Sequence, residues 1–250
     1  MGVDYNWAPG MLTGIALGGS DGSFNVGARQ TSRSTSGGHA AWYTLAEFGP
    51  IYAASTTSVS VFGNRTTRTV AGFGGLNGEV LRGNFSSTKF RSRAEFGYRF
   101  GIAPGLTLTP FYAVEAAQLR SNDFTEAPLA GLGLFALKVR GQTASSVPMF
   151  FGARLTGDLD LGNGMRLRPS LQAAYVPEFA PVRNQIAGLV NLPGAVFLTD
   201  GARPARSALQ VKTGAELASL NNVALSANFD GEFSNRSKTN AGRVAIKVRW

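Results

Sequence analysis

The chain has 250 residues and a formal net charge of +9, with 32 glycines, 17 phenylalanines and no cysteine. The absence of cysteine excludes disulfide scaffolds, thiolate zinc sites and cysteine catalysis. No apolar run reaches the roughly 20 residues that a membrane-spanning helix needs. The enrichment in aromatic residues and glycine, with little glutamate and lysine, favours sheet over helix. The cations are spread over alternating positions and form no basic run, so we expect no nucleic-acid partner.

The first third of the chain predicts strands separated by connections rich in glycine, serine and arginine. Strands are predicted at residues 2–6, 11–19, 40–48 and 51–62. Residues 21–38 are predicted as a connection that is partly strand at 24–28, and residues 64–75 as a second connection. The Gly72-Phe-Gly-Gly75 segment is followed by no helix that could complete a phosphate-binding site, so it is interpreted as a loop.

The clearest alternation covers residues 89–100. Its apolar positions are Phe90, Ala94, Phe96, Tyr98 and Phe100, and its polar positions are Lys89, Arg91, Arg93, Glu95 and Arg99. Such period-2 alternation is typical of a strand with one apolar and one polar face. The next predicted strand, 106–116, contains Pro110, which cannot donate a ladder hydrogen bond, so we expect it near a strand start or an irregularity.

The remainder of the chain continues the same pattern. Strands are predicted at 145–157, 165–175, 209–217, 223–233 and 241–250. Residues 121–130 are predicted as a polar loop, and residues 176–206 as the longest irregular stretch. Short turns near Pro9, Pro50, Pro104, Asn163 and Asn221 alternate with longer polar loops. Short turns on one rim and long loops on the other are typical of outer-membrane barrels.

The last two strands carry charges of opposite sign. Asp230 and Glu232 alternate with apolar residues in the first of them, and Arg243, Lys247 and Arg249 do so in the second. Adjacent strands with one apolar and one charged face each indicate a barrel with lipid outside and a polar lumen. The predicted fold class is therefore all-β, a transmembrane antiparallel β-barrel. In this hairpin the predicted lipid-facing positions are Phe229, Phe233, Val244, Ile246, Val248 and Trp250.

The alternation also predicts which charged side chains line the lumen. They are Lys89, Arg91, Arg93, Glu95, Arg99, Glu115, Arg154, Arg166, Arg168, Lys212, Glu216, Asp230, Glu232, Arg243, Lys247 and Arg249. One interpretation is that they form cross-strand ion pairs in a water-filled pore, which would keep the pore wall solvated so that an unfolded chain does not adhere to it. Aromatic residues near the predicted strand ends suit the two membrane interfaces; these are Tyr98, Phe100, Tyr112, Tyr175 and Trp250.

Seven short segments and the final tripeptide carry a family resemblance. They are Gly-Val-Asp-Tyr at 2–5, Phe-Gly-Pro-Ile-Tyr at 48–52, Arg-Thr-Val at 68–70, Arg-Ala-Glu-Phe-Gly-Tyr-Arg-Phe at 93–100, Leu-Thr-Pro-Phe-Tyr at 108–112, Asp-Gly-Ala-Arg-Pro-Ala-Arg at 200–206, Phe-Asp-Gly-Glu-Phe-Ser at 229–234 and the closing Val-Arg-Trp. In this order, across essentially the whole chain, they resemble the C-terminal translocator domain of autotransporters, the type V secretion proteins of Gram-negative bacteria.

The resemblance implies a twelve-stranded outer-membrane barrel whose lumen is crossed by a helix leading to an upstream passenger. Its implied function is to anchor and export that passenger, without catalysis, cofactor or metal. The implied partners are outer-membrane lipid, the passenger in cis, periplasmic chaperones and the barrel-assembly machinery, which would read the terminal aromatic Trp250. A subset of the lumen charges would then grip the crossing helix or tune conductance. In some families of this kind lumen acids cleave the linker autocatalytically, and Glu95, Glu115 or Glu232 would be the candidates here, but the linker is missing from these residues, so no cleavage role is expected.

The chain departs from the family in its strand count. About eleven strands are predicted, and residues 2–6 resemble the family's second strand. A closed antiparallel barrel needs an even number of strands, because an odd number makes the closing pair parallel. We therefore interpret residues 1–250 as one β-domain that lacks the passenger, the linker helix and the first strand. The strands at 2–6 and 241–250 are expected to be imperfectly paired.

Three other functional or structural classes remain open at this point. A porin-like diffusion channel is favoured by the basic lumen. An outer-membrane enzyme would need a paired constellation in the loops, whereas His39 is the only histidine and allows neither a multi-histidine metal site nor a serine triad. A soluble β-sandwich would require the aromatic faces to pack on one another.

Overall fold

The computed structural model describes residues 1–27, 30–72, 77–162, 164–179, 184–192, 194–200, 205–218 and 223–248. Arg249, Trp250 and the side chain of Val248 lie outside the described part, as do the predicted turn at 220–222 and most of the loop at 72–75. Every regular element in the described residues is a β-strand. None of those residues forms a helix long and apolar enough to cross a membrane.

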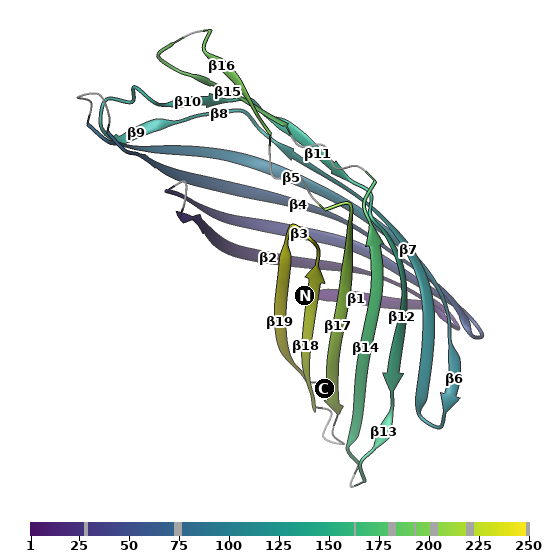
Figure 1. The fold of residues 1–250 in the computed structure, drawn as a ribbon. Helices are drawn as coiled ribbons and strands as arrows, with labels where there is room; N and C mark the ends of the chain where they lie inside the picture. The colour runs from purple at the N-terminus through teal and green to yellow at the C-terminus, as the bar shows by residue number, and fades with distance from the viewer. Residues whose placement is uncertain are drawn as a thin grey trace.

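One large antiparallel sheet makes up most of the molecule (Figure 1). Its eleven principal strands follow the chain in order. They are β1 (Gly2–Ala8), β2 (Met11–Val26), β3 (Thr31–Phe48), β4 (Ile51–Val70), β5 (Glu79–Tyr98), β7 (Leu106–Ser121), β12 (Met149–Gly157), β14 (Arg166–Pro177), β17 (Ser207–Ala218), β18 (Val223–Phe233) and β19 (Lys238–Val248). The predicted all-β class and the predicted strand count are thereby confirmed.

Eight shorter strands complete the structure. Four of them extend the large sheet: β6 (Phe100–Ala103) and β11 (Gln142–Ser146) pair with β7, β13 (Leu159–Asp160) pairs with β14, and β9 (Ala127–Ala130) pairs with β5. The others form a separate four-stranded sheet in the order β16 (Val196–Asp200), β15 (Asn184–Leu189), β10 (Leu137–Val139) and β8 (Phe124–Thr125). This small sheet lies beyond the ends of β12 to β19 (Figure 1).

The large sheet curls into a half-barrel, with β17, β18 and β19 passing in front of β1 to β3 in the view of Figure 1. Its two edges are β1 and β19, and within the described residues neither pairs with the other. The expectation that these strands lack a regular ladder is confirmed. With eleven antiparallel strands in sequence, the two edge strands run in the same direction, so an antiparallel ladder cannot join them.

Three of the predicted short turns are present, at Pro9–Gly10, Gly49–Pro50 and Pro104–Gly105. The glycines there have φ angles of 74° at Gly10, 62° at Gly49 and 72° at Gly105, in the left-handed region that a side chain disfavours. All three turns lie at the same rim of the sheet. They join the first principal strand to the second, the third to the fourth and the fifth to the sixth, and in an antiparallel sheet every second connection lies at the same rim. The connection 234–237 between β18 and β19 is also short, although it lies at the opposite rim, where longer loops were predicted.

Two predicted connections are wrong. Residues 21–38 are strand up to Val26 and again from Thr31, and residues 64–70 continue β4. As a result, β2, β3, β4 and β5 reach 16, 18, 20 and 20 residues, whereas about 9–11 residues suffice to cross a bilayer. The extended halves are polar on both faces, so they lack the hydrophobic alternation on which strand prediction depends.

The other two predicted irregular stretches also contain strands. Residues 121–130 hold β8 and β9, and the described parts of 176–206 hold β15 and β16. Pro110 is not near a strand start, since it pairs with Ala153 inside β7. On its other side, however, the ladder is interrupted between the pairs Gly97–Phe111 and Phe100–Leu108. The expected irregularity therefore lies in the partner strand, opposite the residue that has no N–H.

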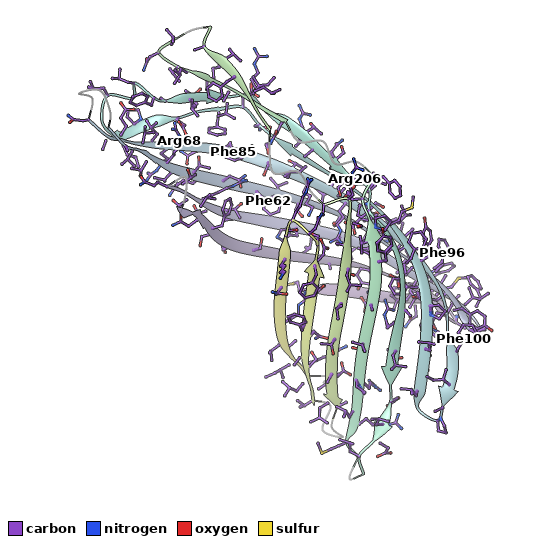
Figure 2. The ribbon with its side chains drawn as sticks, viewed as in Figure 1. Phe62, Arg68, Phe85, Phe96, Phe100 and Arg206 are labelled. Carbon is purple, nitrogen blue, oxygen red and sulfur yellow. The ribbon has the colours of Figure 1, made fainter. Side chains whose placement is uncertain are left out.

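The strand register divides the sheet into two faces. Neighbouring strands lie about 4.8 Å apart, so strands separated by one intervening strand are about twice as far from each other. Their side chains can meet only on the inside of a curved sheet, where curvature brings them together. Arg154 of β12 reaches Glu95 of β5 across the intervening β7, so these residues mark the concave face. Phe96 and Phe100 project from the opposite, convex face (Figure 2). The small buried core also lies on the concave face and consists of Phe111, Ala113, Phe150, Ala174 and Val176.

Candidate functional site

Glu95 is the centre of a charged network on the concave face. Its carboxylate accepts hydrogen bonds from Arg93 Nη2 at 2.9 Å, Arg154 Nη2 at 3.1 Å and the Tyr52 hydroxyl at 2.7 Å. The Glu95 side chain is 12% exposed, so little water is available to replace these donors. Arg93 and Glu95 share a face because they are two residues apart on β5, and the curvature of the sheet brings Arg154 to them.

The arginines of this network cover the apolar core. The Arg93 guanidinium lies 4.1 Å from the ring centroid of Phe150, and that of Arg154 lies 5.3 Å from Phe111. Cations over aromatic faces gain the electrostatic attraction of the ring quadrupole while keeping their carboxylate partners. The concave face thus holds a layered arrangement in which apolar side chains lie against the sheet and ion pairs lie above them.

Glu115 forms a second centre beside the first. Arg91 Nη2 donates to its carboxylate at 2.6 Å, and Arg93 Nη1 lies 3.9 Å away. Because Arg93 contacts both Glu95 and Glu115, the two centres form one connected network across β5, β7 and β12. Shared partners of this kind make the contributions of individual residues non-additive.

More exposed pairs continue around the sheet. Arg99 Nη2 contacts Glu47 at 2.5 Å, Lys212 contacts Asp230 at 2.7 Å, and Arg168 contacts Glu216 at 3.1 Å. Arg166 and Arg168 lie 3.6 Å and 3.7 Å from Asp158. Pairs as exposed as these contribute little to stability individually, typically about 0–1 kcal/mol. Their consequence is mainly to neutralise charge along the concave face.

The register places the sequence-predicted charged residues on this same concave face, apart from Arg249, which lies outside the described residues. Lys89 pairs with Ser60, Glu232 with Gln210, Arg243 with Asn228 and Lys247 with Ala224. Within the described part of the chain, Lys89, Glu232, Arg243 and Lys247 take part in no ion pair. The concave face therefore carries more unneutralised positive than negative charge.

Phe229, Val244 and Ile246 share the convex face and are 40%, 74% and 71% exposed. Phe233 lies on the same face, opposite Leu209 of β17. The exposed convex residues of the neighbouring strands are also apolar; they include Ile15, Trp42, Val59, Phe90, Phe96, Tyr112, Phe151, Leu171 and Tyr175. A continuous exposed apolar band of this extent indicates contact with lipid or another apolar partner.

Several members of the network could not be identified from the alternation of charges. Glu47 and Asp158 pair with the predicted residues Arg99 and Arg166, and the Tyr52 hydroxyl donates to the predicted Glu95. Phe111 and Phe150 were not predicted to form a core on the charged face. Tyr52 lies in the strand predicted at 51–62, so the alternation of that strand alone predicts on which face of the sheet Tyr52 lies. Its contact with Glu95 depends on the register of β4 against β5.

Aromatic rings on the concave face lie over glycines of neighbouring strands. A Cβ atom built on Gly97 would lie 2.4 Å from the Tyr52 ring, and one on Gly37 would lie 2.5 Å from the Phe62 ring. The same relation holds for Gly14 with Tyr43, Gly83 with Phe124 and Gly152 with Phe111. Glycine in a strand interior is destabilising by itself, and a covering aromatic ring compensates for the missing side chain.

Gly97→Ala is expected to destabilise the folded chain by about 1–3 kcal/mol, because the new methyl group would displace Tyr52 from the Glu95 carboxylate. The measurement is the denaturant midpoint of the detergent-folded protein. Gly101→Ala is the matched control, since a Cβ there would meet no atom within 4 Å. Equal midpoints for the two variants would show that the ring is not held by the space above Gly97.

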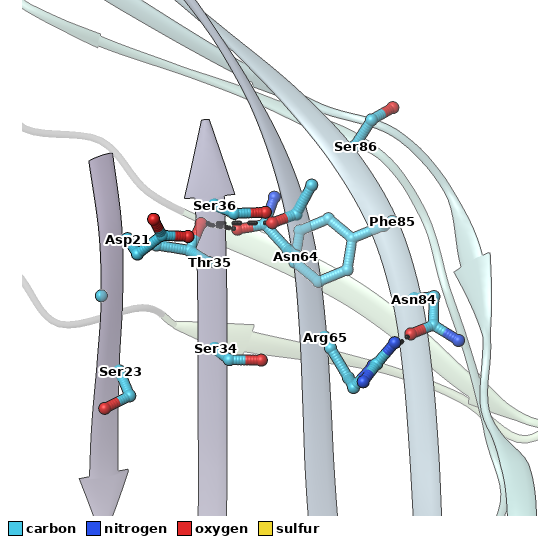
Figure 3. Close-up of a pocket in the computed structure, with 12 residues that line it drawn as sticks. Asp21, Ser23, Ser34, Thr35, Ser36, Asn64, Arg65, Asn84, Phe85 and Ser86 are labelled. Atoms are coloured by element: carbon cyan, nitrogen blue, oxygen red, sulfur yellow. Dashed lines mark hydrogen bonds between the residues drawn. The ribbon is translucent and has the colours of Figure 1, made fainter. Parts of the chain in front are cut away.

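The extended halves of β2 to β5 carry polar residues on the convex face as well. Asp21, Ser36, Arg65 and Asn84 lie beside one another around an open hollow of about 1040 Å³ (Figure 3). On this face Arg65 Nε donates to Asn84 Oδ1 at 3.4 Å. On the concave face behind it, the Thr35 hydroxyl donates to Asn64 Oδ1 at 2.7 Å. The change from an apolar to a polar convex face marks where these strands leave the apolar band.

Two buried carboxylates attach a loop to these extended strands. Glu79 accepts hydrogen bonds from the backbone N–H groups of Leu134 and Phe135 at 2.8 Å and 3.0 Å. Glu126 accepts from two nitrogens of Arg68, at 3.1 Å and 2.5 Å, and from the Leu137 N–H at 3.0 Å. Three backbone N–H groups of residues 134–137 therefore bond to these two carboxylates, and the Arg68 side chain holds the second of them.

The loop contact is expected to depend on pH. Burial of Glu79 opposes ionisation, but the backbone N–H groups around it outweigh burial and lower its pKa below the usual value. A lowered pKa means that the stabilisation is fully present above the pKa of the unfolded chain, about 4.3, and is lost as pH falls through the folded pKa. Amide hydrogen exchange at Leu134 and Phe135 should stay protected above that value and lose protection below it. Glu79→Gln should lack this pH dependence; a pH profile unchanged by the substitution would contradict the assignment.

No group of three or more histidine, aspartate or glutamate side chains suited to a metal ion occurs in the described residues. His39 donates to or accepts from the Ser20 hydroxyl at 2.8 Å, and its ring packs edge-on against Phe62. These contacts place it among the extended strands on the concave face, opposite Gly18 and Ser60.

Comparisons with known proteins agree with this architecture. A family model described as the Autotransporter beta-domain matches residues 1–230. Outer membrane protein B of Rickettsia typhi is 19% identical over 176 residues, which are 70% of this chain but 10% of that protein, so the chain spans only a small part of that relative.

Two solved structures share the fold over 100% of this chain. The translocator domain of the autotransporter NalP from Neisseria meningitidis has a TM-score of 0.74 and 16% identity, with 79% of that chain covered. The beta domain of the Bordetella autotransporter BrkA has a TM-score of 0.61 and 15% identity, with 88% covered. The resemblance identified from dispersed sequence segments is confirmed. The chain belongs to the autotransporter β-domain family.

Proposed function

We propose that the chain forms the membrane barrel that anchors and exports an N-terminal passenger polypeptide. The observation that carries this proposal is the separation of the two faces of one curled sheet. The convex face exposes apolar residues such as Phe151 and Leu171, and the concave face carries the Glu95 and Glu115 networks. In a bilayer-spanning barrel the apolar face contacts lipid and the charged face contacts water in the lumen, so both faces are solvated favourably.

Membership of the family locates the chain in the outer membrane of a Gram-negative bacterium. We propose that the convex apolar band contacts lipid there through Phe229, Phe233, Val244 and Ile246. Val248 and Trp250, whose side chains lie outside the described part of the chain, are proposed to contact lipid as well. Trp250 would also be the signal read by the barrel-assembly machinery, after periplasmic chaperones have kept the unfolded chain soluble. These partners follow from the family resemblance.

The concave charges are proposed to line the pore. Most of these charges are paired, so a translocating polypeptide would meet a pore surface of hydrated ion pairs with no net charge. Such pairs gain little by exchanging water for contacts with the polypeptide. Arg91, Arg93, Arg99, Arg154 and Arg168 each have a carboxylate within 3.1 Å. Such a pore surface would exclude non-specific adhesion of the passenger without holding any one sequence.

Export is tested in a Gram-negative host with the complete gene product that contains residues 1–250, its passenger either kept or replaced by an epitope-tagged reporter. The expected result is that externally added protease removes the reporter from intact cells while a periplasmic marker stays protected. A reporter that remains protease-resistant in cells whose barrel is folded and heat-modifiable on a gel would contradict the export function.

A porin-like diffusion channel is the second candidate, favoured by the unneutralised cations Lys89, Arg243 and Lys247. The two functions differ in what deletion of the barrel changes. An exporter is required for surface display of its passenger, whereas a channel is required for uptake of small solutes. Measuring both in one deletion strain assigns the function to whichever activity is lost.

A further inference from the structure

We infer that the concave face holds a binding site for a small oxyanion between β12, β14, β17, β18 and β19. The site is a cavity of about 390 Å³, within the range of about 300–1,000 Å³ that small-molecule sites occupy. Its charged lining consists of Arg154, Lys212 and Arg243 against one carboxylate, Asp230. The inference rests on the proposed barrel, because the cavity opens to the lumen of that barrel.

The register explains how the cations converge. Arg154, Gln172, Lys212 and Asp230 form one cross-strand row, in which each residue lies opposite the next. Ser170, Gly214, Asn228 and Arg243 form the adjacent row. Residues of one row share a face, so all of these side chains point into the concave side.

Small residues bound the hollow in both rows. Ala241 lies opposite Asp230 at the end of one row and leaves space beside it, and Gly214 lies between Ser170 and Asn228 in the other row and leaves room for the Asn228 amide. A Cβ atom on Gly214 would clash with the Asn228 amide, which lies over the glycine. A larger side chain at Ala241 would fill the space beside Asp230, and one at Gly214 would push the Asn228 amide into the hollow.

The charges in the cavity do not cancel. Arg154 is paired with Glu95 at 3.1 Å, and Lys212 is paired with Asp230 at 2.7 Å. Arg243 has no carboxylate partner within the described residues, although it lines the same cavity. One positive charge is therefore left over, in a cavity that the side chains of Ser170, Gln172 and Asn228 also line.

This chemistry fits an oxyanion. A guanidinium presents paired N–H donors that match phosphate and carboxylate oxygens, and rings of arginine or lysine form the anion sites of phosphate-selective pores. The ligand is therefore a phosphate-type or carboxylate oxyanion, either free in solution or carried as an acidic side chain on a polypeptide in the lumen. An inorganic cation is disfavoured by the excess positive charge.

The test uses the full-length protein in a planar bilayer, with chloride as the carrier of current and inorganic phosphate added to one side. We expect millimolar phosphate to reduce the chloride current. Arg243→Gln should raise the half-blocking phosphate concentration about tenfold, the loss of one charge-assisted contact. Asp230→Asn should lower it, because the substitution removes the only carboxylate in the cavity. A purely structural role for Asp230 does not predict this opposite effect.

Arg120→Gln is the matched control. Arg120 is also an arginine without an ion pair in the described residues, but it lies on the convex face opposite Thr88. The inference is overturned if phosphate leaves the chloride current of the unaltered protein unchanged, or if Arg120→Gln weakens the block as much as Arg243→Gln does. Adding a short glutamate-rich peptide in place of phosphate distinguishes a polypeptide ligand from a free ion.

Calorimetric titration of the detergent-folded protein with phosphate gives the same comparison without an open pore. Absence of phosphate binding in a correctly folded, heat-modifiable barrel would refute the oxyanion site and leave the export function standing. Loss of surface display with intact phosphate binding would refute export and leave the site standing.

Discussion

Glu95→Gln lowers the free energy of unfolding by about 2–4 kcal/mol, the largest effect expected of any single substitution on the concave face. Glutamine keeps the size of the side chain but removes the charge that Arg93 and Arg154 share. Both guanidiniums are mostly covered, with 21% and 33% of their side chains exposed, so water cannot fully replace the carboxylate. The measurement is the urea midpoint of the detergent-folded protein at constant m-value.

The control for this prediction removes the same charge where water is plentiful. Glu216 pairs with Arg168, and their side chains are 37% and 47% exposed. Glu216→Gln should change the free energy of unfolding by no more than about 0.5 kcal/mol. If the two glutamine variants were equally stable, the Glu95 network would be a surface feature and not part of the core that holds β5 to β12.

Leu171→Arg destabilises the membrane-inserted barrel by about 2–4 kcal/mol, the cost of a cation on the lipid face near the bilayer centre. Leu171 is in the middle of β14, faces Leu155 and Thr213 on its neighbours, and is 50% exposed on the convex face. A guanidinium there would have to leave water for hydrocarbon. Unfolding in lipid vesicles measures the effect, since micelles accommodate a charge more easily than a bilayer does.

Ser170→Arg provides the comparison one residue away. Ser170 faces the concave side, where its hydroxyl donates to the Gly214 carbonyl at 3.4 Å. An added arginine would remain in water there, so the variant should lie within about 1 kcal/mol of the unaltered chain. The expected order of stability reverses if the faces have been assigned the wrong way round.

The sequence predicted the fold wherever one face of a strand is apolar. Residues 89–100 alternate strictly, and β5 and β6 cover them. The extended halves of β2 and β3 escaped prediction because Ser32, Ser34 and Ser36 alternate with equally polar neighbours. Where water covers both faces of a strand, backbone hydrogen bonds alone hold the strand in the sheet. Its side chains then need not alternate between apolar and polar, so the sequence shows no strand pattern.

The sequence predicts on which face of the sheet the charged residues lie, but it does not predict which of them contact one another. The alternation places Arg93 and Glu95 on one side of β5 without reference to any other strand. The contact between Glu95 and Arg154 depends on the curvature of the sheet and on β7 lying between their strands. The core of Phe111 and Phe150 on the charged face has the same origin, since the arginines that cover it come from other strands.

The central claim is that the convex face meets lipid and the concave face meets water. The chain has no cysteine, so single-cysteine variants can be labelled with a fluorophore at one position each. Val244→Cys and Ala245→Cys are adjacent on β19 and lie on opposite faces. Quenching of the two labels in proteoliposomes by brominated lipid and by aqueous iodide is the direct measurement. We expect brominated lipid to quench the label at 244 and iodide to quench the label at 245. The reverse result, or equal quenching of both labels by either agent, would contradict the central claim.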